Sequence, residues 1–518
     1  MRHDFEGVRV RSARTMRQHR ALALAAAIGV AGTALAPVPA LAQEDTPGAD
    51  NSGSYAAAPP PVDTSARPQA DGQPDKKYGK KIECVTKDLE YTDEIQNAPW
   101  GQRYLRIDEV HSLMRSTTGA VGVSTDTGKP VKVAVIDTGV RKHAYFKNGV
   151  EGVADYVKRE HKGLEDCDGH GTEVAGIIAA DTPDHIGFIG VAPDVQILSI
   201  RQSSQNYSAD NGGAASGGAP SNPGPSQDSR TQGSEGAGTL GTLAKAIVHA
   251  ADAGAQVINI SINNCRPGSS EMLPDERALQ AAIDYAVNTK DAVVVSAAGN
   301  VSDNTNCEQN SQALAEKPTT IVTPPWFADD VLSVAGIDDT GGVAEFSMHG
   351  PWVSVAAPGT GIISLDPAQG SDGLANMMID GGEAQEIKGT SFAAPYVAGL
   401  AALVRAKYPD LDAHGVMHRI KFTAQHPAAK GGRDNFVGYG VIDPMAALTA
   451  TVPAEENIPP AKAEVLPSDM PPAANRNWTP IVVALVGSGG ALAALGITLF
   501  VVHTIRRNRK NEEDPARP

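Results

Sequence analysis

The chain has 518 residues and a formal net charge of −16, and its 53 glycines and 36 prolines cluster in particular segments. An acidic protein without a basic stripe is not expected to bind nucleic acid through its phosphates. The length permits a core that is stable without structural metals or many disulfides. The composition predicts a glycine-dense α/β core flanked by proline-rich connectors.

Residues 1–42 predict an export signal. Five arginines between positions 9 and 20 precede the apolar run Ala21–Ala36, and small residues at Ala40 and Ala42 frame a cleavage point. A basic segment, an apolar segment and small residues in this order are typical of a secretory signal peptide. Met16 is an alternative start, and either start leads to export.

Residues 43–110 predict an N-terminal extension. Up to about residue 80 the extension is rich in Pro, Ala, Ser, Gly and Asp, a composition that buries too little apolar surface to fold alone. We therefore expect an extended leader in this part. From Cys84 to Leu113 the composition becomes typical of a globular protein.

Residues 111–450 alternate between strand and helix patterns. Short β-branched apolar runs predict strands that are buried on both faces. Strands that alternate with helices imply an α/β fold, with a parallel sheet covered by helices on both faces. The predicted strands are 131–136, 195–200, 257–262, 292–296, 331–335 and 353–356, and the predicted helices are 170–180, 240–253, 276–288, 390–406 and 413–422.

Two segments lie outside this alternation. Residues 203–238 are rich in Gly, Ser, Asn and Pro, and they predict a flexible loop inserted at the surface. Residues 451–478 predict a proline-rich linker.

Residues 479–503 predict one transmembrane helix. The segment has no charged residue as far as Val502 and is long enough to cross a bilayer. Arg506 and Arg507 follow at once, so the positive-inside rule predicts a cytoplasmic tail at 504–518. The rest of the mature chain is then expected outside the cell membrane, attached by a single span.

Four cysteines are present, Cys84, Cys167, Cys265 and Cys307. In an exported protein four cysteines predict two disulfides. Three pairings are possible, and the spacing alone does not choose between them.

Four polar residues stand at strand ends or helix starts. Asp137 follows VKVAVI, His170 lies in DGHGT, Asn300 closes SAAGN, and Ser391 lies in GTSFAAP. Each residue alone also fits a turn or a helix cap. Together they provide what a serine hydrolase needs, namely a nucleophile, a base, an acid that orients the base and a donor for the oxyanion.

The ordered set resembles the subtilase family of serine proteases. The stretches VAVIDTGV, DGHGTEVAGIIAA, SAAGN and GTSFAAPYVAG match its motifs, and the resemblance covers residues 131–447. It implies a subtilisin-like fold and endopeptidase activity. It also implies that Ser391 is the nucleophile, His170 the general base and Asp137 the residue that orients the imidazole. Asn300 and the Ser391 backbone N–H would form the oxyanion hole.

The resemblance also places the substrate, which adds as an extra strand in this family. The end of the strand at Ser261 would bind the substrate backbone, and Ala297, Ala298 and Gly299 would form a pocket wall. These small residues do not identify a preferred substrate side chain.

The order of segments resembles the mycosins, the membrane-anchored subtilases of actinobacterial type VII secretion systems. This narrower resemblance implies protein or peptide substrates, partners in the type VII secretion membrane complex, and a role in supporting that complex. Secreted subtilases have a compact inhibitory pro-domain, which residues 43–110 do not predict. We expect instead an extension that wraps the catalytic domain, with a removable propeptide as the alternative.

Topology favours one pairing of the cysteines. Cys265 and Cys307 each follow a predicted strand, and both emerge at one edge if these strands are neighbours in a parallel sheet. A Cys265–Cys307 bond leaves Cys84–Cys167, which would pin the extension beside the loop before His170.

We expect no cofactor and no required metal. The sequence has no dense carboxylate loop of the calcium-binding kind, and Asp166 and Asp168 are interpreted as polar loop residues. Two classes of function stay open, a working endoprotease and a scaffold of the secretion complex whose proteolysis is dispensable. A cell-wall hydrolase is disfavoured because the chain lacks a paired-carboxylate or zinc-ligand pattern.

Overall fold

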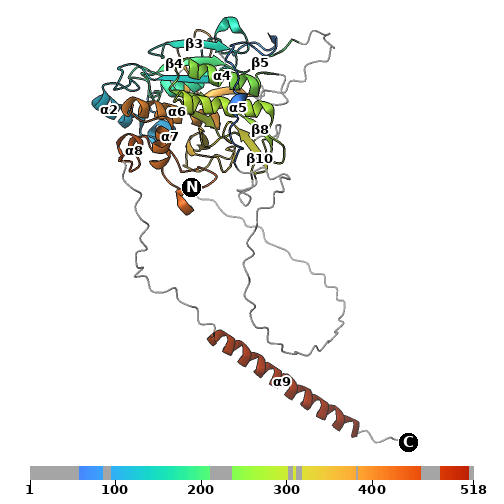
Figure 1. Cartoon of the computed structure of the whole chain (residues 1–518). Coiled ribbons are helices and arrows are strands. Elements are labelled where there is room, and N and C mark those ends of the chain that lie inside the picture. Colours follow the sequence, from blue (N-terminus) through green and yellow to red (C-terminus); the bar gives the residue numbers. More distant parts are fainter. Residues whose placement is uncertain are drawn as a thin grey trace, which may run out of the picture. The chain divides into compact units, whose positions relative to one another are not determined.

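The computed structural model describes residues 58–85, 95–210, 236–301, 307–310, 318–380, 383–456 and 479–512 (Figure 1). The predicted signal peptide lies outside the described residues, as do residues 211–235 of the predicted loop and 457–478 of the predicted linker.

A seven-stranded sheet forms the centre of the domain, with the strand order β12-β11-β9-β7-β2-β4-β3. Every neighbouring pair is parallel, which confirms the predicted α/β class. The inner strands are apolar on both faces because helices cover both sides of the sheet. The strands are β2 (Lys132–Asp137), β3 (Val150–Asp155), β4 (Gln196–Arg201), β7 (Val257–Ile260), β9 (Val293–Ala297), β11 (Val331–Ile337) and β12 (Val355–Pro358).

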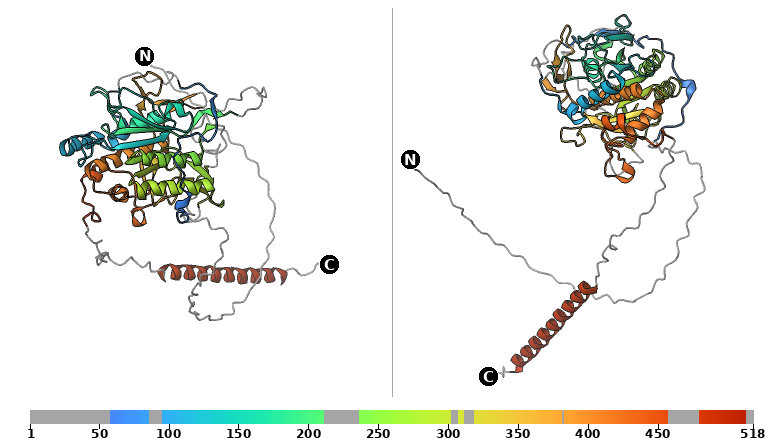
Figure 2. Two further views of the ribbon diagram at one scale, coloured as in Figure 1. Left: turned by 45° about the horizontal axis from the view of Figure 1, so that its top comes forward. Right: turned by 90° about the vertical axis from the view of Figure 1, so that its left-hand side faces the viewer.

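Helices pack against this sheet (Figure 2), and α6 is the longest of the helices that do so. Seventeen of its residues, from Thr390 to Ala406, are buried, because alanine and glycine let neighbouring elements approach closely. It contacts α3 and five strands of the sheet, while α4 and α5 pack on each other. The helices are α1 (Trp100–Tyr104), α2 (Ile107–Thr118), α3 (His170–Ala179), α4 (Leu240–Asp252), α5 (Pro274–Asp284), α6 (Thr390–Lys407), α7 (Ala413–Phe422) and α8 (Pro444–Thr449).

Three elements differ from the sequence prediction. β3 was not predicted, because VEGVAD mixes charged and small residues at an edge of the sheet. α2 crosses residue 110, so the predicted boundary of the extension falls inside a helix. The predicted helix 276–288 ends as an α-helix at Asp284 and continues as a π-helical turn, Tyr285–Thr289.

A small antiparallel sheet joins the extension to the insertion. β5 (Ser204–Ala209) pairs with β1 (Tyr78–Lys80) of the extension on one side and with β6 (Gly236–Ala237) on the other. The prediction of an irregular loop from residue 203 is therefore wrong for β5. Its polar residues do not indicate a strand by themselves, since the pairing partner lies far away in the sequence.

The described part of the extension lies against α4, α5 and the turn that follows α5. Lys245 contacts Asp71 at 2.7 Å, and Gln280 donates to the carbonyl oxygen of Pro60 at 2.8 Å. The guanidinium of Arg67 lies 4.2 Å from the centre of the Tyr285 ring. The extension is thus held on the surface of the domain at several points.

Two disulfides are present, Cys84–Cys167 and Cys265–Cys307, which are the pairs that the topology favoured. Cys265 lies in β8, the partner of β10 in a two-stranded antiparallel sheet. The remaining strands also form antiparallel pairs, and their bounds are β8 (Asn264–Pro267), β10 (Thr320–Thr323), β13 (Ser364–Leu365), β14 (Leu374–Ala375), β15 (Met377–Asp380) and β16 (Glu383–Glu386).

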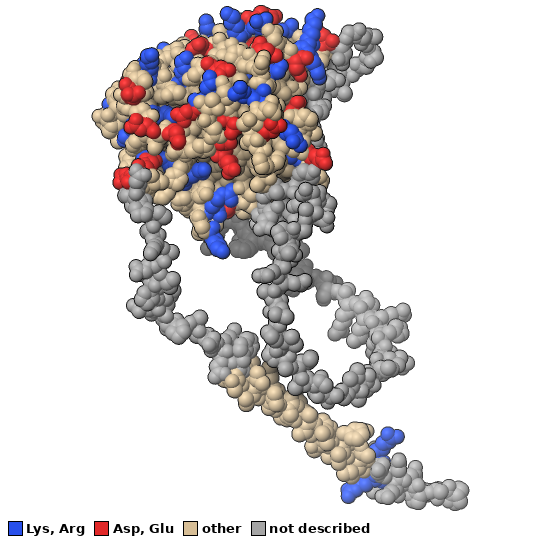
Figure 3. All heavy atoms as spheres, in the orientation of Figure 1, with Lys and Arg blue, Asp and Glu red and all other residues tan. Residues whose placement is uncertain are grey.

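Within the part of the chain that the structure describes, α9 (Thr479–Glu512) is the one helix long and apolar enough to cross a membrane. Figure 3 shows an uncharged surface along most of α9 and basic side chains near its C-terminal end. These basic residues include Arg506, Arg507 and Arg509.

Candidate active site

Asp137 is the last residue of β2, at the carboxyl end of the central sheet. Its side chain is fully buried, and the backbone N–H of Thr138 donates to Oδ1 at 2.7 Å. Parallel strands bring their carboxyl ends to the same edge, which is where α/β folds gather functional groups. β2 therefore presents the carboxylate to the loops that cross this edge.

His170 is the first residue of α3 and meets Asp137 directly. Its Nδ1 lies 2.7 Å from Asp137 Oδ1, and both side chains are buried. A carboxylate at this position holds the proton on Nδ1 and leaves Nε2 as the basic nitrogen. Gly169, which precedes the helix, has a φ of 88°, a conformation that glycine adopts without steric cost.

Ser391 is the second residue of α6. The next residue, Phe392, places its ring 5.0 Å from the imidazole of His170, measured between centroids. Ser391 also forms two hydrogen bonds with Ser261, which follows β7. The Ser261 hydroxyl donates to the Ser391 carbonyl at 2.8 Å, and Ser391 Oγ donates to the Ser261 carbonyl at 3.3 Å. The predicted substrate-binding residue Ser261 and the predicted nucleophile are thus neighbours.

Asn300 follows β9 and is tied to the residue before Ser391. Its Oδ1 accepts from both the backbone N–H and the hydroxyl of Thr390, each at 2.9 Å. Since Oδ1 is engaged in this way, the amide NH₂ is the end that can donate to a substrate. Thr390 was not predicted as a site residue, although it lies inside the GTSFAAP stretch.

In the predicted pocket wall, Gly299 is the position whose conformation and close packing favour glycine. Ala297 and Ala298 are fully buried. Gly299 has a φ of 102°, and a Cβ added there would lie 3.1 Å from Val322 Cγ1 and 3.2 Å from Met348 Cγ. A larger residue at position 299 would meet both conformational strain and these two side chains.

The chain is similar in sequence to known proteins over most of its length. The family model Peptidase_S8, described as the subtilase family, matches residues 128–440. Mycosin-1 of Mycobacterium tuberculosis is 39% identical over 460 residues, which span 87% of this chain and 95% of that protein. Mycosin-3 of the same organism is 39% identical over 400 residues, covering 74% of this chain and 82% of that protein.

Solved structures are similar as well. One is the crystal structure of MycP1 from the ESX-1 type VII secretion system, with a TM-score of 0.64 and 38% identity over 76% of this chain and 97% of that one. Another is a chain of an intact ESX-5 inner membrane complex, with a TM-score of 0.65 and 37% identity over 86% of this chain and 100% of that one.

Proposed function

The chain belongs to the subtilase family of serine proteases and, within it, to the mycosins, and from this premise we propose that Asp137, His170 and Ser391 are its catalytic triad. The observation that carries this assignment is the 2.7 Å contact between His170 Nδ1 and Asp137 Oδ1, with the start of α6 beside the imidazole. In this proposal the three residues carry out the subtilisin-like endopeptidase reaction of the family.

In the proposed reaction, Ser391 Oγ attacks the carbonyl carbon of the scissile peptide while His170 Nε2 takes the hydroxyl proton. Asp137 stabilises the imidazolium that forms. The imidazolium then gives its proton to the leaving nitrogen as the C–N bond breaks, and an acyl ester on Ser391 remains. Water, deprotonated by His170, hydrolyses this ester and restores the enzyme.

The proposed oxyanion hole consists of the Asn300 side-chain amide and the backbone N–H of Ser391. Thr390 fixes the Asn300 carbonyl oxygen, so the amide group needs no reorientation when negative charge develops on the substrate. Donors that are already oriented in a buried site stabilise the transition state more than the ground state.

We also propose that the protein is a single-pass membrane protein of a type VII secretion complex. α9 supplies the span, and the basic residues after it favour a cytoplasmic C-terminus with the catalytic domain outside the membrane. A similar chain is part of an ESX-5 inner membrane complex, which supports assembly into such a complex. In this proposal the enzyme processes secreted proteins and also supports the complex.

The first test is labelling of the full-length protein in detergent with a fluorophosphonate, for the wild type and Ser391→Ala. Labelling of the wild type alone is expected. A wild type that is folded but unlabelled would contradict the proposed triad.

A scaffold with dispensable proteolysis is the second candidate, and the ESX-5 similarity is the observation that favours it. Complementation of a deletion strain separates the two roles. If Ser391→Ala restores secretion fully, assembly is the required role; if it restores complex formation but not substrate cleavage, both roles are present.

A further inference from the structure

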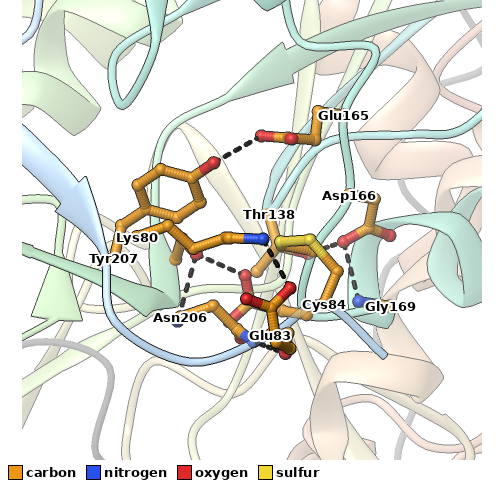
Figure 4. Close-up of a disulfide and its surroundings, with 12 residues drawn as sticks. Lys80, Glu83, Cys84, Thr138, Glu165, Asp166, Gly169, Asn206 and Tyr207 are labelled. Carbon is orange, nitrogen blue, oxygen red and sulfur yellow. Dashed lines mark hydrogen bonds and ion pairs between the residues drawn. A yellow bond between two sulfur atoms is a disulfide. The ribbon is translucent and has the colours of Figure 1, made fainter. Parts of the chain in front are cut away.

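Residues 165–168 lie where three distant parts of the chain meet (Figure 4). Cys167 is bonded to Cys84 of the extension, and the backbone N–H of Val85 donates to the Cys167 carbonyl at 2.9 Å. Asp168 contacts the insertion, and Asp166 contacts the loops on either side of the catalytic pair. The two carboxylates that flank the disulfide thus face different partners.

The Asp166 carboxylate is fully buried and accepts four hydrogen bonds. Oδ1 accepts from the Thr138 hydroxyl and the Gly169 N–H, both at 2.8 Å. Oδ2 accepts from the Thr172 N–H at 2.8 Å and from the Thr172 hydroxyl at 2.6 Å. One carboxylate therefore binds the residue after Asp137 and residues on both sides of His170.

The hydroxyl groups of Thr138 and Thr172 extend this hydrogen-bond network to the neighbouring backbone. The Thr138 hydroxyl donates to Asp166 and accepts from the Gly171 N–H at 3.0 Å. The Thr172 hydroxyl donates to Asp166 and accepts from the Arg141 N–H at 3.0 Å. Each hydroxyl has one proton, so an acceptor-only carboxylate fixes the direction of both. The result is two cross-links between the Asp137 loop and the His170 helix.

At Gly171 the backbones of the Asp137 loop and the His170 helix lie too close together to leave room for a side chain. A Cβ added at Gly171 would lie 2.0 Å from the Gly139 carbonyl oxygen and 3.1 Å from Asp137 Cβ. The relative position of the two loops is therefore set by backbone contact and by the hydrogen bonds around Asp166. A displacement of about 1 Å in an active site can cost on the order of a hundredfold in rate.

We propose that Asp166 is a positioning residue, which holds the Asp137 carboxylate and the His170 imidazole in their productive geometry through Thr138 and Thr172. The proposal rests on the proposed roles of Asp137 and His170. Asp166 itself touches neither the substrate nor the reacting atoms.

The test compares Asp166→Asn with Asp168→Asn in the full-length protein. An amide at 166 must turn its NH₂ group toward one backbone N–H and one threonine hydroxyl whichever way it lies. That N–H then loses its acceptor, and the hydroxyl must reverse its direction. An amide at 168 keeps both contacts. Its oxygen can accept from the Gln205 N–H, and its NH₂ can donate to the Ser204 hydroxyl, which reverses the direction of that one bond. The two variants remove the same charge from the same segment.

The readout is turnover of a peptide substrate per active centre, with the centres counted by fluorophosphonate titration. Asp166→Asn is expected to lower kcat per centre by about tenfold to a hundredfold with little change in KM. Weaker support of the imidazolium is also expected to move the acidic limb of the kcat/KM profile to lower pH. Asp168→Asn is expected to retain the wild-type kcat and pH profile.

Two results with these variants would overturn the proposal. One is an unchanged kcat and acidic limb in Asp166→Asn, and the other is an equal loss of kcat in Asp168→Asn.

If Asp166→Asn does not fold, Thr138→Val and Thr138→Ser replace it. The valine variant should lose kcat while the serine variant retains it, and equal activities of the two would also overturn the proposal. An unlabelled wild type would instead reject the proposed triad, and with it this role for Asp166.

Discussion

The catalytic side and the extension side of the segment 165–168 use carboxylates in opposite ways. Asp166, on the catalytic side, is buried and accepts four hydrogen bonds. Asp168, on the extension side, is partly buried and accepts two, from the Ser204 hydroxyl and the Gln205 N–H. Burial, reinforced by the nearby charge of Asp166, raises the pKa of Asp168 to about 6 despite these two hydrogen bonds.

This difference teaches that the two sides tolerate different changes. On the catalytic side four hydrogen bonds fix the Asp166 carboxylate, so a lost hydrogen bond should appear in the rate. On the extension side the contacts hold polypeptide segments together, so a lost contact should appear in the stability of the fold. The following predictions test that division, from the largest expected effect to the smallest.

Asn300→Asp tests the catalytic side most strongly. The aspartate keeps an oxygen for Thr390 and replaces the donor NH₂ with an oxygen that repels the developing oxyanion. We expect kcat to fall by about 10²–10³-fold while KM changes little, as for loss of an oxyanion donor in related enzymes. Steady-state kinetics per titrated centre measure this loss. A change confined to KM would place Asn300 in substrate binding instead.

Removal of the Cys84–Cys167 bond by paired serine substitutions tests the extension side. The bond closes a loop across a sequence separation of 83, so its loss is expected to lower the free energy of unfolding by about 2–4 kcal/mol. Urea unfolding measures the change. The matched control removes Cys265–Cys307, which has a separation of 42 and does not involve the extension. Unchanged stability without Cys84–Cys167 would show that the extension does not brace the fold.

Asp168→Asn gives a pH-dependent effect on stability. The folded pKa of about 6 lies above the ordinary value of 3.8, so the wild type gains stability from protonated Asp168 at low pH and loses it as pH rises through 6. The asparagine variant lacks this loss. Its stability relative to the wild type should therefore rise between pH 4 and pH 7, by on the order of 2 kcal/mol when partial exposure is allowed for. Urea unfolding at both pH values measures this change. An equal difference in unfolding free energy between variant and wild type at pH 4 and pH 7 would reject the raised pKa of Asp168.

The sequence predicted the central fold well because each signal there is local. The apolar runs became strands at nearly the predicted bounds, and parallel packing then brought Asp137 and Asn300 to one edge of the sheet. His170 and Ser391 open helices that leave the same edge. A motif at a strand end is therefore sufficient to place a side chain in this class of fold.

The peripheral features could not be read in the same way because they depend on distant segments. β5 is polar and becomes a strand only beside β1, which lies in the extension. Asp166 was interpreted as an ordinary loop residue, because its role depends on Thr138, which is 28 residues away in the sequence, as well as on Gly169 and Thr172. Val322 and Met348 reach Gly299 only after β10 and the loop after β11 have folded. Contacts of this kind need the tertiary structure.

The most direct test of the proposed triad is to trap the acyl enzyme. A peptide ester with alanine at the cleaved position would be mixed with the full-length protein, quenched during the burst and mapped by mass spectrometry. We predict that the acyl group lies on Ser391 in the wild type and is absent from Ser391→Ala. Substrate turnover with the acyl group on another residue, or turnover that survives Ser391→Ala, would contradict the account.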